Sequence, residues 1–208
     1  NSIDTLGEII NEVNANTTMP AIAFIDGQEV LFFSSDRETG KGGMDIYYSF
    51  IKNGQQFGKV QALKSVNSPD NEISPFWDDK TQRLYFSSTW HNGFGGFDVF
   101  YTELINGAFA GPANLGIPIN SSANDTYFFT YQDTNYVTSN RLGVLFSKNP
   151  TCCSDILSLY IPVRETPLTL KETLVELNKR LPVTLYFHND WPDPKTTATT
   201  TKINYLDN

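Results

Sequence analysis

The stretch LFFSSDRETGKGGMDIYYS, beginning at Leu31, occurs a second time in altered form as LYFSSTWHNGFGGFDVFYT, beginning at Leu84. Each copy has a β-rich run that ends in two serines, a loop rich in glycine, and then Gly-Gly, one variable residue, Asp and a second β-rich run. A third, more divergent copy consists of YVTSNRLG from Tyr136 and CCSDILSLY from Cys152. Internal repeats of this kind predict a fold built from one repeated unit.

Two sets of landmarks keep the same period along the chain. Asp45, Asp98 and Asp155 are 53 and 57 residues apart, and Asn11, Asn67 and Asn120 are 56 and 53 residues apart. Within the first unit, PAIAFIDG, EVLFFSSDR, MDIYYSFIKNG and FGKVQALKSVN each read as a short strand, with Asp-Gly and Asn-Gly as hairpin turns. Four short antiparallel strands per unit are typical of a β-propeller blade.

We therefore predict an all-β chain of about three four-stranded antiparallel repeats, forming β-propeller blades within a larger propeller. The expected boundaries are a partial repeat at 1–11 and blades at 20–67, 74–120 and 126–162. Propellers typically close with about four to eight blades, so we expect the chain to be a segment of a longer protein, with closure by a second chain or an unusual tail arrangement as the alternative.

Residues 163–208 read differently from the repeats. Leucines recur at near-helical spacing between positions 168 and 181, with Thr169 as an N-cap and Glu172 three residues later. An alternating run, Val183 to His188, follows and leads into a proline-rich turn. We expect a short linker helix and then a first strand of a further domain.

The repeated aspartates invite a structural interpretation before a catalytic one. Asp45, Asp98 and Asp155 each follow a pair of small residues at the start of a strand. A carboxylate in that position can accept hydrogen bonds from the backbone N–H groups of a tight turn. Catalysis does not need three copies, so we interpret these residues as part of the repeat's construction.

Composition excludes some classes of partner. The 208 residues carry a net charge of −8, which argues against a nucleic-acid partner, because binding phosphates needs clustered Lys and Arg. No apolar run approaches the roughly 20 residues that span a bilayer, so no transmembrane segment is expected. The two cysteines, Cys152 and Cys153, are adjacent. We favour a reduced or incidental pair, with a strained vicinal disulfide as the alternative.

No catalytic, cofactor or metal site is predicted. The two histidines, His91 and His188, have no zinc-ligand spacing, and neither a nucleophile elbow nor a phosphate loop is present. Carboxylates cluster between positions 70 and 79: Asp70, Glu72, Asp78 and Asp79. Calcium takes oxygen ligands, but solvated turn residues are the favoured interpretation of that cluster. We expect a protein that is not an enzyme and needs no cofactor.

Loop aromatics are the candidate contact residues. Trp90, His91 and Phe94 lie in the glycine-rich loop of the second copy, and Trp191 lies in the turn of the tail. Aromatic side chains on loops are common anchors for protein or glycan partners. Packing between blades is the alternative for Phe94.

The pattern [LY]-[FY]-F-S-S-[DT]-x followed by G-G-x-D-[IV]-[YF] resembles the PD40, or TolB-type, β-propeller repeat. The motif L-G-x-x-[IV]-N-S between blades is similar to one branch of that group, the Bacteroidota envelope proteins that join such a propeller to an OmpA-like domain. Some members belong to the type IX secretion and gliding apparatus. The tail LPVTLYFHNDWPDP resembles the opening of the OmpA-like domain. The third copy departs from the pattern, with Cys153-Ser154 in place of Gly-Gly.

This resemblance implies an exported, non-enzymatic scaffold, located in the periplasm or at the outer membrane, whose propeller binds other envelope proteins. Peptidoglycan would be bound through a domain beyond this chain, because the Asp and Arg that hold it in OmpA-like domains have no counterpart before Asn208. The alternative function is a glycan- or peptide-binding propeller that uses its loop aromatics.

Overall fold

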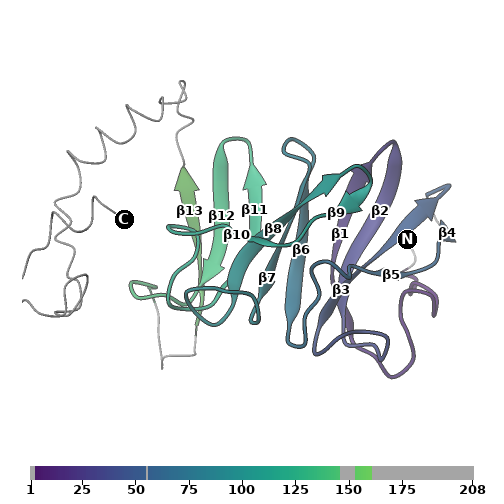
Figure 1. Ribbon diagram of the computed structural model, residues 1–208, viewed down its shortest axis with the longest axis horizontal. Coiled ribbons are helices and arrows are strands. Elements are labelled where there is room, and N and C mark those ends of the chain that lie inside the picture. The colour runs from purple at the N-terminus through teal and green to yellow at the C-terminus, as the bar shows by residue number, and fades with distance from the viewer. Residues whose placement is uncertain (1–2, 55, 146–152, 161–208) are drawn as a thin grey trace, which may run out of the picture. The chain divides into compact units, whose positions relative to one another are not determined.

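A computed structural model describes residues 3–54, 56–145 and 153–160, all within a compact unit that spans Asn1–Pro162. Every regular element in this part of the chain is a β-strand, and all strand pairs are antiparallel, which confirms the prediction of an all-β antiparallel fold (Figure 1). The predicted linker helix, the strand from Val183 to His188 and Trp191 lie outside the described residues. A search of the described residues for a helix long and apolar enough to cross a membrane finds none.

Three sheets follow one another along the chain. Sheet 1 contains β1 (Thr17–Ile25), β2 (Gln28–Ser35), β3 (Asp45–Lys52), β4 (Gln56–Phe57) and β5 (Gln61–Ala62). Sheet 2 contains β6 (Glu72–Asp78), β7 (Arg83–Ser88), β8 (Asp98–Ile105), β9 (Ala108–Phe109) and β10 (Ala113–Asn114). Sheet 3 contains β11 (Asp125–Tyr131), β12 (Thr134–Ser139) and β13 (Asp155–Tyr160).

The hairpins are set by turn residues that the sequence makes recognisable. Asp26 and Gly27 join β1 to β2 with φ angles of 50° and 78°, and Asn106 and Gly107 join β8 to β9 with φ angles of 52° and 78°. Positive φ at both central residues is the type I′ geometry, whose twist matches that of the flanking strands. These turns fix the register of the paired strands.

Each first strand carries a bulge at the same place. The register shifts between Thr18 and Ala21 in β1, and equivalent shifts occur in β6 and β11. The bulges contain residues with positive φ: Met19, Ser74 and Tyr127. A bulge bends its strand and increases the local twist, so all three first strands curve alike.

The sheets stack face to face through alternating apolar side chains. Val30 and Phe32 of sheet 1 pack against Leu84 and Phe86 of sheet 2. The opposite face of sheet 2 packs against sheet 3 through a second cluster: Tyr85, Val99, Ile119, Phe128 and Val137. Because side chains of a strand alternate between its faces, β7 supplies both clusters.

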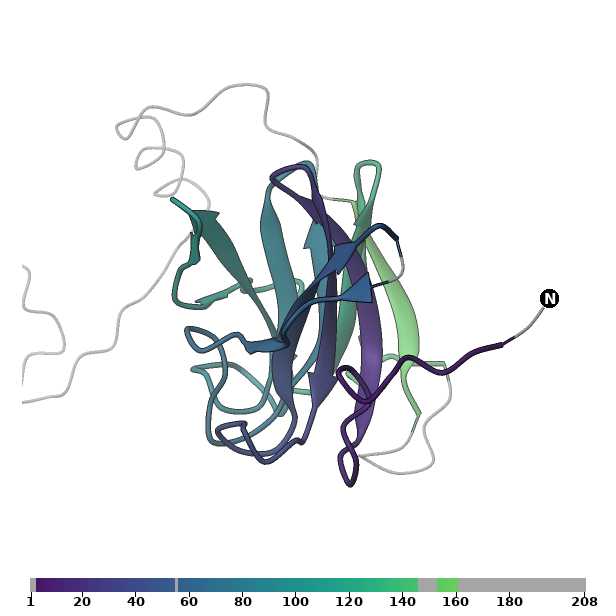
Figure 2. The same ribbon diagram turned by 90° about the vertical axis from the view of Figure 1, so that its right-hand side faces the viewer.

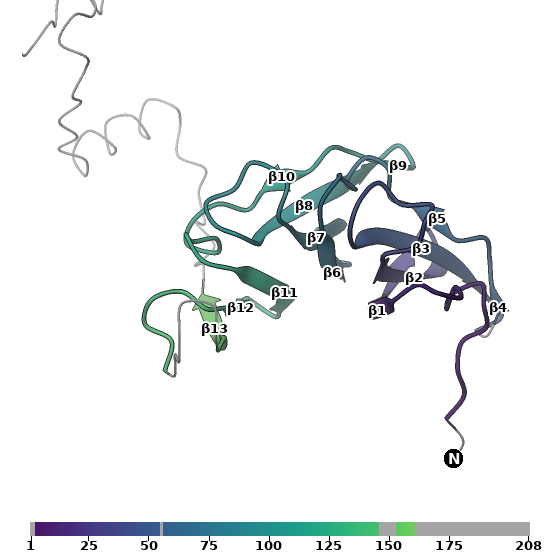
Figure 3. The ribbon, with the colours of Figure 1, turned by 90° about the horizontal axis from the view of Figure 1, so that it is seen from below.

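The first strands lie together on one side of the stack. β6 packs against β1 on one flank and β11 on the other. Seen from below, β1, β6 and β11 follow the inner side of a curved row, and β5, β9 and β10 lie on the outer side (Figure 3). Equivalent strands of successive sheets, such as β1 and β6 or β2 and β7, run in roughly the same direction (Figure 2). The loops that join β2 to β3 and β7 to β8 therefore lie at the same end of sheets 1 and 2.

Candidate interaction surface at the loop end of the sheets

The loop end is defined here by residues 36–44, which join β2 to β3, and residues 89–97, which join β7 to β8. It lies at the bottom of Figure 1, and the β1–β2, β6–β7 and β11–β12 hairpins lie at the top. The two loops share one construction, which the following contacts explain.

A buried aspartate fixes the backbone of each loop. Asp98 Oδ2 accepts hydrogen bonds from the backbone N–H groups of Phe94 at 2.8 Å and Gly95 at 2.9 Å. Asp45 Oδ2 likewise accepts from Lys41 N and Gly42 N. Burial raises the pKa of the Asp45 carboxyl, and the hydrogen bonds from Lys41 and Gly42 oppose that effect. In sheet 3, Asp155 Oδ2 accepts from the N–H group of Leu145.

Glycine is required where these loops touch the next linker. A Cβ on Gly42 would lie 2.1 Å from the backbone carbonyl of Pro69, and a Cβ on Gly95 would lie 2.0 Å from the carbonyl oxygen of Ala123. The loop backbone therefore packs directly on the linker that leads to the next sheet.

Asparagines clamp these linkers to the sheets. Asn67 accepts from Ile46 N and donates to Ile46 O, both at 2.9 Å. Asn120 makes the same two bonds to Val99, at 2.7 and 2.8 Å. The spacing between Asn67 and Asn120 thus corresponds to a repeated side-chain clamp on β3 and β8, whereas Asn11 donates to the carbonyl oxygen of Leu6.

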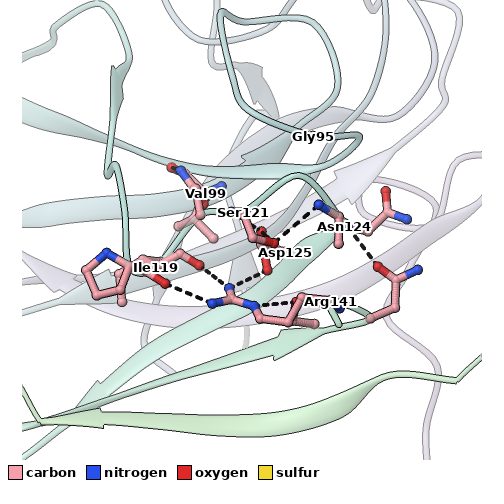
Figure 4. Close-up of polar contacts among 12 residues, drawn as sticks. Gly95, Val99, Ile119, Ser121, Asn124, Asp125 and Arg141 are labelled. Atoms are coloured by element: carbon pink, nitrogen blue, oxygen red, sulfur yellow. Dashed lines mark hydrogen bonds and ion pairs between the residues drawn. The ribbon is translucent and has the colours of Figure 1, made fainter. Parts of the chain in front are cut away.

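An arginine closes the loop end of sheet 3 (Figure 4). Arg141 Nη2 contacts Asp125 Oδ1 at 2.6 Å, Nη1 donates to Pro118 O at 2.9 Å, and Nε donates to Ser139 Oγ at 2.9 Å. Nη2 also donates to the carbonyl oxygen of Ile119. The Asp125 side chain is fully buried, so this guanidinium neutralises a carboxylate that water does not reach.

The same position in sheet 1 holds another arginine. Arg37 lies two residues after Ser35, as Arg141 lies two residues after Ser139. Its Nη2 donates to the carbonyl oxygen of Ile10 at 2.7 Å, and its guanidinium lies over the rings of Phe33 and Tyr47. Arg37 is 5% exposed, so it serves as a structural residue of the loop end.

Sheet 2 departs from this arrangement. Trp90 stands two residues after Ser88, in the place of the two arginines, and is 57% exposed. The neighbouring His91 supplies the missing contact, because its Nε2 lies 2.7 Å from the carbonyl oxygen of Val66, the counterpart of Ile10 and Ile119. A carbonyl oxygen only accepts, so Nε2 carries the proton and donates it. His91 thus replaces the arginine, and Trp90 is left facing solvent.

Glu72, at the start of β6, lies next to the β7–β8 loop, and its hydrogen-bond partners are serines rather than an arginine. Its carboxylate accepts from Ser68 N at 2.7 Å, Ser68 Oγ at 2.5 Å and Ser88 Oγ at 2.8 Å. Burial raises the pKa of Glu72, and the bonds from Ser68 and Ser88 and the charge of His91 partly oppose the increase. Asp125, the equivalent carboxylate of sheet 3, has Arg141 instead.

Phe94 is the second exposed aromatic side chain of the loop, at 55% exposure. Its backbone N–H is held by Asp98, and the adjacent Gly95 packs on Ala123. Trp90 is fixed through its own N–H, which donates to Ser88 Oγ at 3.1 Å. Two exposed aromatic rings therefore project from a backbone that is tied down on both sides, a preorganised contact surface.

The sequence-predicted residues thus separate into three groups. Trp90 and Phe94 come together in one exposed loop, and His91 is half-buried and bonded to Val66. Trp191 lies outside the described residues. The sequence did not single out Arg37 and Arg141, although their constant distance from the second hydroxyl residue of each copy was a usable signal.

The carboxylates between positions 70 and 79 do not form a metal site. Glu72 begins β6 and Asp78 ends it, while Asp79 accepts from the indole N–H of Trp77 at 2.8 Å and Asp70 accepts from the amide of Asn71. Among the described residues, no group of three or more His, Cys, Asp or Glu side chains is placed to hold a metal ion.

Cys153 is disulfide-bonded, which contradicts the favoured expectation of a reduced pair. Cys152, the other cysteine of the chain, lies outside the described residues. The expectation was wrong because it weighed only the strain between adjacent residues. Cys153 has a φ of 70°, so the backbone at this position is itself in an unusual conformation.

No protein-family model and no curated protein matches the chain. Among solved structures, the chain is similar to the catalytic domain of the GH62 alpha-L-arabinofuranosidase of Coprinopsis cinerea, with 15% identity and a TM-score of 0.39. The match covers 59% of this chain and 42% of that one.

This comparison corrects the prediction that the chain is not an enzyme, because the neighbour is a catalytic domain. The prediction rested on the lack of a recognised catalytic pattern, and one fold can carry many unrelated sets of catalytic residues on its loops. We therefore withdraw it. The likeness transfers no residue, substrate or activity to this chain.

Proposed function

We propose that the chain is a protein-interaction module whose contact surface is the β7–β8 loop, with Trp90 and Phe94 as its anchors. The observation that carries the proposal is the departure of sheet 2 from its neighbours. An exposed tryptophan stands where sheets 1 and 3 have an arginine bound to a linker carbonyl, and His91 maintains that bond. Exposed aromatic side chains on a rigid backbone are typical hot spots of protein interfaces.

The module is, in this proposal, a segment of a β-propeller whose blades are the three sheets. Their antiparallel strand order and the packing of β6 between β1 and β11 support it. A propeller presents its loops as a rigid surface, which suits a scaffold.

The proposed context is the cell envelope. The sequence resemblance to PD40-type envelope proteins supports an exported protein, located in the periplasm or at the outer membrane, that binds other envelope proteins. Anchoring to peptidoglycan would need an OmpA-like domain whose binding residues lie beyond this chain. Secretion or gliding machinery is the process in which such a scaffold would act.

Photocrosslinking in the host cell tests this proposal. A photoreactive phenylalanine analogue at Phe94 of the full-length protein should yield one dominant adduct with an envelope protein, and Trp90→Ala should abolish it. Tyr131 is a matched control, because it is 64% exposed but lies at the hairpin end of β11. An analogue at Tyr131 should not give the same adduct. Equal labelling from both positions, or an adduct insensitive to Trp90→Ala, would remove the proposed surface.

A glycan- or peptide-binding function is the second candidate, since Trp90 could equally stack on a sugar ring. A broad glycan array with the wild-type chain and the Trp90→Ala variant separates the two. Saturable, Trp90-dependent glycan binding would favour this candidate, and its absence would leave the protein-binding function.

A further inference from the structure

A second surface feature lies away from the loop end, in a groove of about 790 Å³ between sheets 1 and 2. The apolar walls come from both sheets, with Phe32, Tyr48 and Phe50 on one side and Leu104 and Phe109 on the other. The ring centroids of Tyr48 and Phe109 are 6.2 Å apart. The Tyr48 hydroxyl can donate a hydrogen bond at neutral pH, and burial raises its pKa further. The volume is typical of ligand-binding sites.

The groove exists where sheet 1 departs from the pattern of sheet 2. Val30 and Phe50 are a cross-strand pair of sheet 1, and the pair at the same place in sheet 2 is Arg83 and Glu103. The Arg83 guanidinium lies 4.3 Å from the ring centroid of Tyr101 and 2.7 Å from the Glu103 carboxylate. The Arg83–Glu103 ion pair therefore covers Tyr101. The equivalent Tyr48 has the apolar pair Val30 and Phe50 at that place instead.

The mouth of the groove is basic. Lys59 and Lys64 line it and are exposed, and neither forms an ion pair within the described part of the chain. At the corresponding positions, sheet 2 has Gly111 and Gly116. Asp26 is the one acidic lining residue. Two unpaired lysines in a chain of net charge −8 create a local attraction for anions.

Neutral polar side chains complete the lining. Gln28 and Gln61 are exposed at the groove. Each amide has donors and an acceptor, which are the groups that a peptide backbone needs as partners. A hydrocarbon ligand would leave those amides unused, whereas an extended peptide would use the amides, the apolar walls and the lysines together.

We propose that this groove binds a short extended peptide that carries apolar side chains flanked by Asp or Glu. The apolar side chains pack along the groove against Phe50, Leu104 and the contacting rings of Tyr48 and Phe109, and the acidic residues pair with Lys59 and Lys64. This site is separate from the loop end and does not depend on the function proposed for Trp90.

Fluorescence anisotropy with three labelled, acetylated hexapeptides tests the proposal on the full chain. The probes are Asp-Glu-Leu-Phe-Glu-Asp, Lys-Lys-Leu-Phe-Lys-Lys and Asp-Glu-Ser-Ser-Glu-Asp. The first should bind saturably and more weakly at high ionic strength, and the other two should bind at least about tenfold more weakly. Lack of saturable binding by the first probe, or equal binding of the lysine probe, overturns the proposal.

Two variants locate the binding. Lys59→Glu/Lys64→Glu changes only exposed side chains and should weaken the first probe by about tenfold or more. Val30→Arg/Phe50→Glu transfers the ion pair of sheet 2 into the groove and should abolish binding, with circular dichroism as the check on folding. Trp90→Ala should leave binding unchanged.

Opposite results place the probe elsewhere. Binding that survives the lysine reversal overturns the proposal, as does binding lost in Trp90→Ala. A chain that self-associates through this groove, shown by a dimer that Lys59→Glu/Lys64→Glu dissociates, would assign the groove to a second copy instead and would also overturn it.

Discussion

Replacing Arg141 by Met should cost much more stability than replacing Arg83 by Met, although both arginines form equally short ion pairs. The N–O distance is 2.6 Å from Arg141 to Asp125 and 2.7 Å from Arg83 to Glu103. The side-chain exposures differ, at 22% and 0% for the first pair and 33% and 41% for the second. Burial therefore decides the difference between them.

The expected magnitudes follow from what each substitution leaves behind. Loss of Arg141 leaves Asp125 charged and out of reach of water, and breaking a buried pair costs about 3–5 kcal/mol. Because Arg141 is itself partly exposed, we expect about 2–4 kcal/mol. The partly exposed Arg83 pair is worth about 0–1 kcal/mol, and its stacking on Tyr101 adds about 0.5–1 kcal/mol, part of which a methionine retains. We expect about 1 kcal/mol for Arg83→Met.

Urea unfolding followed by tryptophan fluorescence measures both free energies, provided that the denaturant slope stays constant. Asp125→Asn/Arg141→Met should recover part of the loss, because it removes the orphaned charge together with its partner. High salt should diminish the effect of Arg83→Met but not that of Arg141→Met. Equal costs for the two single variants, or a cost of Arg141→Met that disappears in salt, would refute the reasoning.

Three further predictions concern the loop end of sheet 2. Burial raises the pKa of Glu72 above its value in the unfolded chain. The stability that Glu72 contributes is therefore fully present below the unfolded pKa and is lost as pH rises through the folded pKa. Glu72→Gln should remove this loss, which the unfolding free energy measured against pH would show. Gly95→Ala should cost about 3 kcal/mol or more because its Cβ would meet a backbone oxygen, whereas Gly111→Ala, with no atom within 4 Å, should change the unfolding free energy by less than about 0.5 kcal/mol. His91→Ala should cost about 1 kcal/mol through its bond to the Val66 carbonyl, and an unchanged melting temperature would show that this bond contributes nothing.

Local sequence predicted the strands and their turns because both depend on neighbouring residues. Asp26-Gly27 and Asn106-Gly107 adopt the positive φ angles of hairpin turns. LFFSS and LYFSS are continuous β-favouring runs, whose successive side chains point to opposite faces of the sheet in β2 and β7. The repetition of these runs and the turn chemistry together led to the prediction of an all-β antiparallel fold.

The contacts of Arg37 and Arg141 with distant backbone carbonyls could not be predicted from the local sequence. Arg141 reaches the carbonyl of Ile119 across 22 residues, and Arg37 reaches that of Ile10 across 27 residues. Nothing in the local pattern distinguishes such an arginine from a solvated one, since its partner is a backbone atom of unremarkable sequence. Comparison of equivalent positions in the repeats was the one signal that could have identified both arginines.

The carboxylates between positions 70 and 79 are close in the sequence but not in the structure, because strand β6 separates them. Glu72 and Asp78 are six positions apart, but they occupy the two ends of β6. At about 3.3 Å per residue an extended strand separates such residues by roughly 20 Å. Carboxylates that look clustered in the sequence therefore belong to opposite ends of the sheet, where one is buried among serines and the other closes a hairpin turn.

Departures within one repeated framework carry information that a single site would not. The three sheets impose the same backbone demands at equivalent positions, so Trp90 in place of arginine is not a consequence of local geometry. The cross-strand pair Val30 and Phe50 of sheet 1 corresponds to Arg83 and Glu103 in sheet 2 and to Thr134 and Tyr160 in sheet 3, so the side chains at this position differ in all three sheets. The first change leaves Trp90 exposed, and the second leaves Phe50 lining the groove between sheets 1 and 2. His91 offsets the first by restoring the bond to the linker carbonyl, which keeps the loop in place. Because the lost polar contact is replaced by a neighbouring residue, the exposed tryptophan is compatible with an ordered loop, as a binding surface requires.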